Sequence, residues 1–208
     1  MTELWLVRHG ETEWSLSGRH TGRTDIALTA HGRERAVELG KFLARTPIAA
    51  VLCSPLRRAR ETCEIAGYGS VAVVDEGLCE WDYGVYEGRT SGEIQAEIPG
   101  WSVWKDAIVG GETVEQVGAR ADGVIARALA VASGEPRSQN RDLGHPTEDA
   151  ARVALFAHAH ILRILAARWI GLEAREGCRF VLGTGSVSVL GWEKETRVVE
   201  RWNRGFEE

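Results

Sequence analysis

The chain has 208 residues and a net charge of −5 at pH 7, with both signs of charge mixed along its length. A chain of this length is expected to form one domain, 1–208, whose core is large enough to need no disulfide or metal. The mixed charge excludes the basic surface of a nucleic-acid-binding protein. The amino terminus has no basic segment followed by a long apolar one, so we expect a protein that stays in the cytoplasm and acts on a small molecule.

The cysteines and the apolar segments exclude two further classes. The widely spaced Cys53, Cys63, Cys79 and Cys178 form no C-x-x-C pair, so we expect reduced thiols, no zinc site and no other cofactor. The longest later apolar stretch, 161–172, contains two arginines, which is typical of a buried amphipathic helix and not of a membrane span. We therefore expect no membrane partner, and the sequence leaves a homodimer open.

Short apolar runs predict β-strands along the chain. They cover residues 4–7, 49–53, 71–74, 153–157 and 187–192, with a further candidate at 196–199. Thr29 is a candidate N-cap for a helix that ends before Pro47, and a second helix follows Pro55 and ends at Gly67. A long helix from about residue 112 and another at about 161–170 complete the pattern.

Strands that alternate with helices predict an α/β fold, a three-layer α/β/α sandwich with a mostly parallel central sheet. The order of the strands is not predicted. Between 133 and 150 the composition changes to Ser, Gly, Pro, Asn, Gln and charged residues. This change indicates a flexible insertion with little function, His145 included.

The first candidate site is formed by Arg8 and His9, which follow the first strand and precede Gly10. Ligands bind at the carboxyl edge of open α/β sheets, so both side chains are predicted to project into a crevice there. This pair indicates a phosphate site that contains its own nucleophile. The alternative is a solvated strand end without chemistry.

Arginines gather at the start of the second predicted helix. Arg57, Arg58 and Arg60 lie where free backbone N–H groups already give a partial positive charge, so an anion is needed to compensate them. Arg57 comes first and is predicted to reach back over the sheet edge. We expect Arg58 and Arg60 on the surface.

Two histidines, His158 and His160, follow the strand at 153–157. A metal site would need further ligands, and no Asp, Glu or Cys lies at ligand spacing nearby. We therefore expect an anion to hold His158 in its protonated form, in which it donates a hydrogen bond to phosphate.

Glu80 lies in a loop with Trp81 and Tyr83. Partial burial beside the aromatic rings is expected to keep this carboxylic acid protonated, so that it can give a proton to a leaving oxygen. The alternative is a loop glutamate that caps a backbone group.

Together these motifs resemble the histidine phosphatase superfamily, in its phosphoglycerate-mutase-like branch, over nearly the whole chain. The resemblance rests on Leu6-Val7-Arg8-His9-Gly10-Glu11, Leu28-Thr29-x-x-Gly32, Ser54-Pro55-Leu56-x-Arg58-Ala59-x-x-Thr62, Glu80-x-x-x-Gly84-x-x-Glu87-Gly88, Gly111-Glu112-Thr113 and Ala157-His158. It implies a two-step reaction in which a histidine attacks phosphorus and water later cleaves the phosphohistidine. Arginines and an imidazolium would supply the positive charge without a metal.

The resemblance also implies roles for individual residues. His9 corresponds to the nucleophile, Glu80 to the proton donor and later base, and three residues, Arg8, Arg57 and His158, to the groups that bind phosphate. Further substrate contacts are expected from Ser15, Thr21, Gly22, Trp81, Tyr83 and Ala159. The family usually has glycine at position 159. If the backbone there needs a conformation that only glycine adopts, the methyl group of Ala159 reduces the rate or alters substrate choice.

Three functions stay open under this resemblance. Family mutases have a basic residue after the glutamate, whereas this chain has Trp81, and its tryptophan-containing segments look most like the branch with sedoheptulose bisphosphatase and acid phosphatases. We therefore expect a phosphomonoesterase that acts on a small phosphorylated metabolite, such as a sugar phosphate or bisphosphate. A second phosphate could meet Arg19, His20, Arg23 or Lys105. The alternatives are a phosphoglycerate mutase and a catalytically silent protein that binds phosphorylated ligands.

Overall fold

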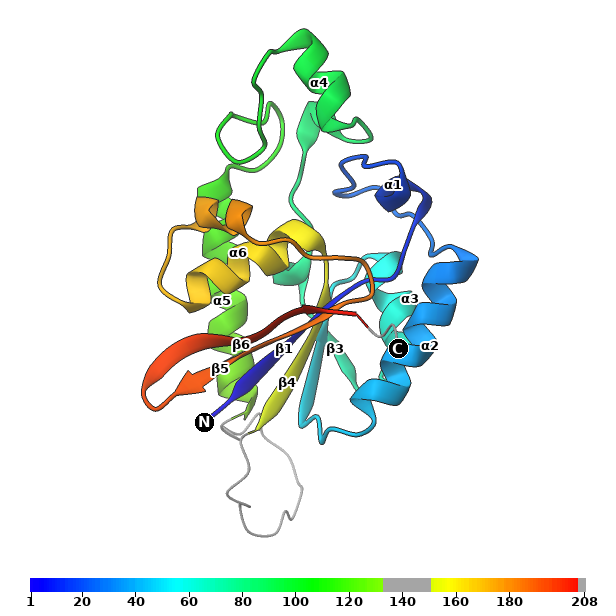
Figure 1. The fold of residues 1–208 in the computed structure, drawn as a ribbon, viewed down its shortest axis with the longest axis vertical. Coiled ribbons are helices and arrows are strands. Elements are labelled where there is room, and N and C mark those ends of the chain that lie inside the picture. The colour runs from blue at the N-terminus through cyan, green and yellow to red at the C-terminus, as the bar shows by residue number, and fades with distance from the viewer. Residues whose placement is uncertain (133–150, 206–208) are drawn as a thin grey trace.

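The computed structural model describes residues 1–132 and 151–205, so the predicted insertion at 133–150 lies outside the described residues. Within them the chain forms one mixed sheet flanked by helices (Figure 1). The strands are β1 (Glu3–Arg8), β2 (Ala50–Cys53), β3 (Ala72–Val74), β4 (Arg152–Ala157), β5 (Val187–Glu193) and β6 (Thr196–Arg204). The helices are α1 (Glu13–Leu16), α2 (Ala30–Leu43), α3 (Arg57–Ile65), α4 (Ser91–Glu97), α5 (Val114–Ala132) and α6 (Ala159–Trp169), with short 3-10 helices η1 (Glu76–Leu78), η2 (Gly84–Tyr86) and η3 (Ala174–Arg179).

The strands lie in the order β3-β2-β4-β1-β5-β6. Strands β1 to β4 pair in parallel, whereas β5 and β6 form an antiparallel edge next to β1. Parallel pairs need crossover connections, which α2, α3 and α5 provide. Each predicted strand is present, and the mostly parallel sheet is confirmed.

The side chains of β1 alternate between two cores, one on each face of the sheet. Leu4 and Leu6 pack on the face covered by α5 and α6, and Trp5 and Val7 pack on the face covered by α2 and α3 (Figure 1). A strand buried on both faces reads as a continuous apolar run, as this one does. The prediction of a three-layer α/β/α sandwich is therefore confirmed.

The helix boundaries follow local capping. Thr29 caps α2, because its hydroxyl accepts a hydrogen bond from the Gly32 N–H at 2.9 Å, as predicted. Helix α5 begins later than predicted and α6 begins earlier, at Ala159. The early start of α6 makes His158 its N-cap residue and places His160 in its first turn.

The parallel register brings strand ends together at one edge of the sheet. Arg8, at the end of β1, pairs with Ala157, at the end of β4, and the end of β2 lies in register on the other side of β4. His9 and His158 therefore leave the sheet side by side. The segments that contain α1 and α4 lie beyond this edge, at the opposite end of the molecule from the amino terminus (Figure 1).

The sequence predicts neither a membrane span nor a metal site, and the described residues can be searched for both. No helix within 1–132 and 151–205 has the length and apolar character needed to cross a bilayer. The same ranges contain no group of three His, Cys, Asp or Glu side chains suited to a metal ion, and all four cysteines are free thiols. The apolar stretch at 161–172 mostly forms α6, whose apolar residues are buried as predicted.

Candidate active site

A pocket of about 470 Å³ opens at the carboxyl edge of the sheet. Its walls come from the end of β1, the start of α6, the loop after α1 and the segments that flank η2 and α4. Of the residues predicted for the site, it is lined by Arg8, His9, Ser15, Thr21, Glu80, Tyr83 and Ala159. This volume fits a small metabolite.

His9 is buried at the pocket, and its ring has a defined tautomer. Its Nδ1 lies 2.7 Å from the carbonyl oxygen of Gly10. A carbonyl can only accept, so Nδ1 carries the proton and Nε2 keeps its lone pair. Burial lowers the pKa of His9 well below its usual value, and the charges of Arg58 and Arg8 lower it further. His9 is therefore a neutral imidazole with a free Nε2, the form that can act as a nucleophile.

His158 lies beside His9, with ring centroids 5.2 Å apart. Its Nε2 lies 2.8 Å from the hydroxyl of Ser54. Burial, together with the neighbouring Arg58 and His9, lowers the pKa of His158 well below its usual value. The expected imidazolium is therefore not the form that the protein alone favours, because cations surround the ring. A bound anion would have to offset them.

The arginine that reaches this site is Arg58, which corrects two predictions. Arg58, expected on the surface, is fully buried and donates to the carbonyl groups of Thr21, Gly22 and Thr24 at 2.9 to 3.0 Å. Arg57, expected in the pocket, is exposed, and its Nε lies 3.9 Å from a carboxylate oxygen of Glu61 in the next turn. Neither arginine is among the residues that line the pocket, but Arg58 lies behind its wall, close enough to His9 to lower the pKa of that ring.

Helical geometry explains this reversal. The buried positions of α3 are Arg58, Ala59, Thr62 and Cys63, which follow the i, i+1, i+4, i+5 pattern of one helix face. Residue 57 lies off this face, so its side chain points to solvent. The small and apolar residues after Arg58 contained this signal in the sequence.

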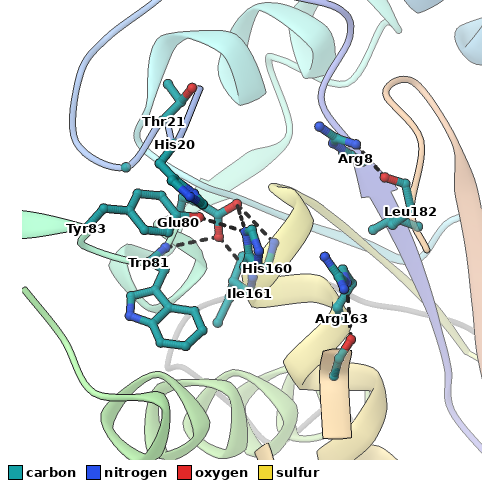
Figure 2. A network of polar contacts seen from close by, with 12 residues as sticks. Arg8, His20, Thr21, Glu80, Trp81, Tyr83, His160, Ile161, Arg163 and Leu182 are labelled. Atoms are coloured by element: carbon teal, nitrogen blue, oxygen red, sulfur yellow. Dashed lines mark hydrogen bonds and ion pairs between the residues drawn. The ribbon is translucent and has the colours of Figure 1, made fainter. Parts of the chain in front are cut away.

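Several buried nitrogens around His9 have no hydrogen-bond partner in the described residues. They are the Nε atoms of Arg8 and Arg58 and the Nδ1 atom of His158. Arg8 also donates through Nη1 to the carbonyl of Leu182 (Figure 2), and burial lowers its pKa to about 10, although Glu80 opposes this shift. Buried donors are normally paired, so three unpaired nitrogens here indicate a site for an oxygen-rich anion.

Glu80 is held as a carboxylate by three backbone N–H groups. Its Oε1 accepts from Trp81 and Ile161, and its Oε2 accepts from His160, each at 3.0 Å (Figure 2). Burial alone would raise the pKa of Glu80, but the hydrogen bonds that it accepts from His160, and the attraction of the His160 and His158 rings whenever these are protonated, lower it well below its usual value. The prediction that Glu80 is protonated is therefore wrong for the protein without a bound ligand. The contacts with His160, through its ring first and its backbone N–H second, together with His158, outweigh the effect of burial beside the aromatic rings.

His160, left without a role by the sequence, also lines the pocket. Its Nδ1 lies 2.7 Å from the hydroxyl of Tyr83 and 3.8 Å from Oε2 of Glu80 (Figure 2). Its ring packs against Trp104, with centroids 5.1 Å apart. No spacing rule marks this residue, because its partners come from a loop far away in the sequence.

Arg163 is a second residue that the sequence analysis missed. It lies one helical turn after His160, lines the pocket, and places its guanidinium 4.7 Å from the ring centroid of Trp104. Its Nε donates to the carbonyl of Gly177 at 3.1 Å (Figure 2). The spacing of three residues from His160 could have placed both on one helix face.

The remaining predicted contacts divide into two groups. Ser15, Thr21, Tyr83 and Ala159 line the pocket, whereas Gly22 and Trp81 do not. Gly22 instead donates its N–H to the Glu87 carboxylate at 2.9 Å, and Trp81 is fully buried with its indole N–H on the carbonyl of Glu112 at 2.8 Å. Gly22 follows Thr21 and Trp81 follows Glu80, so both lie next to residues of the pocket wall without lining the pocket themselves.

Position 159 does not need glycine in this protein. Ala159 is the first residue of α6 and is not among the described non-glycine residues with positive φ. The backbone strain that a non-glycine residue could cause here is therefore absent. At position 159 the chain differs from the usual family residue, glycine, only by the methyl group at the pocket.

The expected contacts for a second phosphate also divide. Arg19 and His20 line the pocket, whereas Arg23 and Lys105 do not. Arg23 is exposed and ion-paired with Asp82 at 2.6 Å.

Residues 4–205 match the family model of the histidine phosphatase superfamily (branch 1). The chain belongs to this superfamily. This histidine phosphatase is 40% identical over 196 residues to an acid phosphatase of Mycobacterium tuberculosis, covering 93% of this chain and 88% of that protein. It is 36% identical over 201 residues to the sedoheptulose 1,7-bisphosphatase of Saccharomyces cerevisiae, covering 85% of this chain and 70% of that protein.

The fold is also similar to that of a solved structure. A protein from an open reading frame of Mycobacterium tuberculosis matches this histidine phosphatase with a TM-score of 0.86 and 36% identity, over 98% of both chains. The resemblance read from the motifs is therefore confirmed, and the chain is a phosphomonoesterase of this family.

Proposed function

We propose that this histidine phosphatase hydrolyses a small phosphorylated metabolite, a sugar phosphate or bisphosphate, through a phosphohistidine on His9. No metal ion or cofactor takes part in the proposed reaction. The observation that carries the proposal is the free Nε2 of His9 beside the unpaired buried nitrogens of Arg8, Arg58 and His158. These donors suit the oxygens of a phosphoryl group.

In the first step, Nε2 of His9 attacks phosphorus as the bond to the leaving oxygen breaks. Arg8 and Arg58 stabilise the negative charge on the phosphoryl oxygens, which is the main requirement of phosphoryl transfer. The leaving oxygen takes a proton from Glu80. Two negative charges on the bound monoester raise the pKa of the nearby carboxyl, so Glu80 takes up this proton when substrate binds.

In the second step, water attacks the phosphohistidine. Glu80, again a carboxylate, accepts the water proton, and the bond between phosphorus and Nε2 of His9 breaks. Its three backbone hydrogen bonds hold the carboxylate in one place for both proton transfers. The products are inorganic phosphate and neutral His9.

The outer walls of the pocket favour a sugar as the alcohol. Trp101 and Trp104 line them, so two aromatic rings are available to the apolar face of a sugar. Arg163 and Arg19 add positive charge on the same walls. The similarity to a sedoheptulose 1,7-bisphosphatase supports a substrate with a second phosphate.

The mutase alternative lacks a cation at the expected place. Trp81 follows Glu80, and its ring is buried with its N–H committed to Glu112. The position therefore offers no charge to the carboxylate of a phosphoglycerate. A silent binding protein is disfavoured because the nucleophile, the proton donor and the phosphate-binding cations are all present.

The test is a screen of phosphate release with a chelator present. The substrates are sugar mono- and bisphosphates, 3-phosphoglycerate and p-nitrophenyl phosphate, and we expect the fastest release from the sugar phosphates. Quenching in alkaline detergent, in which the phosphorus–nitrogen bond survives, should trap a ³²P-labelled protein that His9→Ala does not form. Release that survives His9→Ala rejects the nucleophile, and activity abolished by the chelator rejects the metal-free reaction. A requirement for 2,3-bisphosphoglycerate indicates the mutase.

A further inference from the structure

Tyr83 and His160 form a pair that contacts Glu80. The Tyr83 hydroxyl lies 2.7 Å from Nδ1 of His160, and the same nitrogen lies 3.8 Å from Oε2 of Glu80 (Figure 2). The backbone N–H of His160 donates to that oxygen as well, at 3.0 Å. One histidine therefore joins a buried tyrosine to the proposed proton donor through both its ring and its main chain.

The environment indicates which atom holds the proton between Tyr83 and His160. Burial, with the nearby Glu80, raises the pKa of Tyr83 well above its usual value, so it is a neutral phenol with a proton to donate. Burial lowers the pKa of His160; Glu80 opposes this shift, and Arg163 and Arg8 add to it. A neutral imidazole protonated on Nε2 can accept from the phenol at Nδ1, whereas an imidazolium cannot.

We propose that Tyr83 is a positioning residue: by donating to Nδ1 it keeps His160 neutral, and so leaves Glu80 able to take up the proton that the leaving oxygen needs. An imidazolium 3.8 Å from Glu80 would instead stabilise the carboxylate, and the proton would then stay on His160. The inference rests on the proposed phosphatase reaction.

The position of the transferable proton distinguishes a site with a neutral His160 from one with a protonated His160. When a phosphate monoester dianion binds, Glu80 takes one proton from solvent while Tyr83 and His160 keep theirs. As phosphorus exchanges its leaving oxygen for Nε2 of His9, this proton passes to the leaving oxygen and Glu80 becomes a carboxylate again. Without the phenol, the solvent proton goes to Nδ1 of His160, and Glu80 has none to give.

The other groups around His160 support its neutral form. The His20 ring lies 6.3 Å from the His160 ring and 4.8 Å from the Tyr83 ring, and burial lowers the pKa of His20 to about 4. Arg163 and Arg8 are cations, and Trp104 is an uncharged ring against His160. Glu80 is the acidic group whose charge favours the imidazolium, which makes the hydrogen bond from Tyr83 decisive.

The test compares two probes with different leaving groups. p-Nitrophenyl phosphate releases an acidic phenol that needs little protonation, whereas glycerol 2-phosphate releases an alcohol that needs a general acid. In Tyr83→Phe, we expect kcat for glycerol 2-phosphate to fall by about tenfold or more, up to the roughly 10²–10⁴-fold that a general acid contributes. The fall for p-nitrophenyl phosphate should be much smaller. The basic limb of the kcat profile for glycerol 2-phosphate should move to lower pH.

Two variants provide controls. Adding His160→Asn to Tyr83→Phe removes the ionisable ring, so it should return the basic limb towards its wild-type position. Tyr86→Phe removes the hydroxyl of a buried tyrosine that packs on Trp101, with ring centroids 4.9 Å apart, and should leave both probes unaffected. Equal losses for both probes with an unmoved limb in Tyr83→Phe would overturn the proposal.

A measurement without turnover separates this inference from the proposed function. The ¹⁵N chemical shifts of the His160 ring, assigned by their loss in His160→Asn, should show a neutral ring with a bare Nδ1 at pH 7. In Tyr83→Phe the ring should become protonated at higher pH than in the wild type. A protonated His160 in the wild type rejects this inference, whereas activity that survives His9→Ala rejects the proposed function.

Discussion

The guanidinium group of Arg58 donates to the carbonyl oxygen of Thr21 at 2.9 Å, across 37 residues of sequence. With its bonds to Gly22 and Thr24, this contact ties the loop after α1 to the start of α3. Arg58 also acts electrostatically on His9. One buried cation therefore shapes the pocket wall and tunes the proposed nucleophile.

Arg58→Ala should reduce both the stability and the activity of the protein, whereas Arg57→Ala should not. Removing Arg58 leaves three carbonyl groups without their donor, which costs about 1–3 kcal/mol of stability. It also removes a cation from the phosphoryl site, so we expect kcat/KM to fall by about 100-fold or more. Urea denaturation and steady-state kinetics measure the two effects. Arg57→Ala is the matched control, and a larger loss there than in Arg58→Ala would restore Arg57 as the phosphate-binding arginine.

The acid limb of the pH profile of kcat/KM should lie at unusually low pH. The pKa of His9 is lowered by burial first and then by Arg58 and Arg8, so its Nε2 stays unprotonated well below pH 6.5. With p-nitrophenyl phosphate, kcat/KM should therefore persist at pH 5. In Arg58→Gln the nearby charge is gone, the pKa of His9 rises and the acid limb moves to higher pH. An acid limb at the same pH in both proteins would show that Arg58 does not act on the titrating group.

The central strands and much of the candidate site could be predicted because β1, β2 and β4 each carry a continuous apolar run that is followed by polar residues. For this reason β1 and β4 identified Arg8, His9 and His158 as neighbours. The order β3-β2-β4-β1-β5-β6 could not be predicted, because pairing depends on how crossovers pack. Position at the start of the helix favours Arg57, whereas the helix face marked by Ala59, Thr62 and Cys63 buries Arg58.

The protonation states were harder to predict than the positions. Burial beside Trp81 and Tyr83 favours a neutral acid at Glu80, but the contacts with His160, through its ring and its backbone N–H, lower the pKa of this carboxyl group. His160 had no assigned role, since its contacts with Tyr83 and Glu80 depend on a helix that begins earlier than its sequence pattern indicates. Both errors concern tertiary contacts between segments distant in sequence.

Ala159→Gly tests the departure from the usual family pattern. Ala159 starts α6 with an ordinary helical conformation, so glycine should bring no relief of strain and should cost up to about 1 kcal/mol of stability. Loss of one methyl group at the pocket should change kcat/KM by less than about tenfold, with the direction depending on substrate size. Kinetics on a small aryl phosphate and a sugar bisphosphate measure both. A gain above tenfold on every substrate would mean that the methyl group obstructs phosphate itself.

Stability should fall as the pH drops from 7 to 5. Burial and neighbouring cations lower the pKa values of His9 and His158, so below pH 6.5 the unfolded chain binds more protons than the folded one. The free energy of unfolding therefore rises with pH in this window, by up to about 1.4 kcal/mol per pH unit for each such histidine.

Urea denaturation at pH 5, 6 and 7 measures this slope. His158→Asn removes one of the titrating rings and should make the pH dependence shallower. Inorganic phosphate should reduce the loss at pH 5, because a bound anion favours the protonated rings and stabilises the folded state by mass action. An identical slope in His158→Asn and the wild type would mean that the pKa of His158 is the same in the folded and the unfolded chain, so that burial and the neighbouring cations do not shift it.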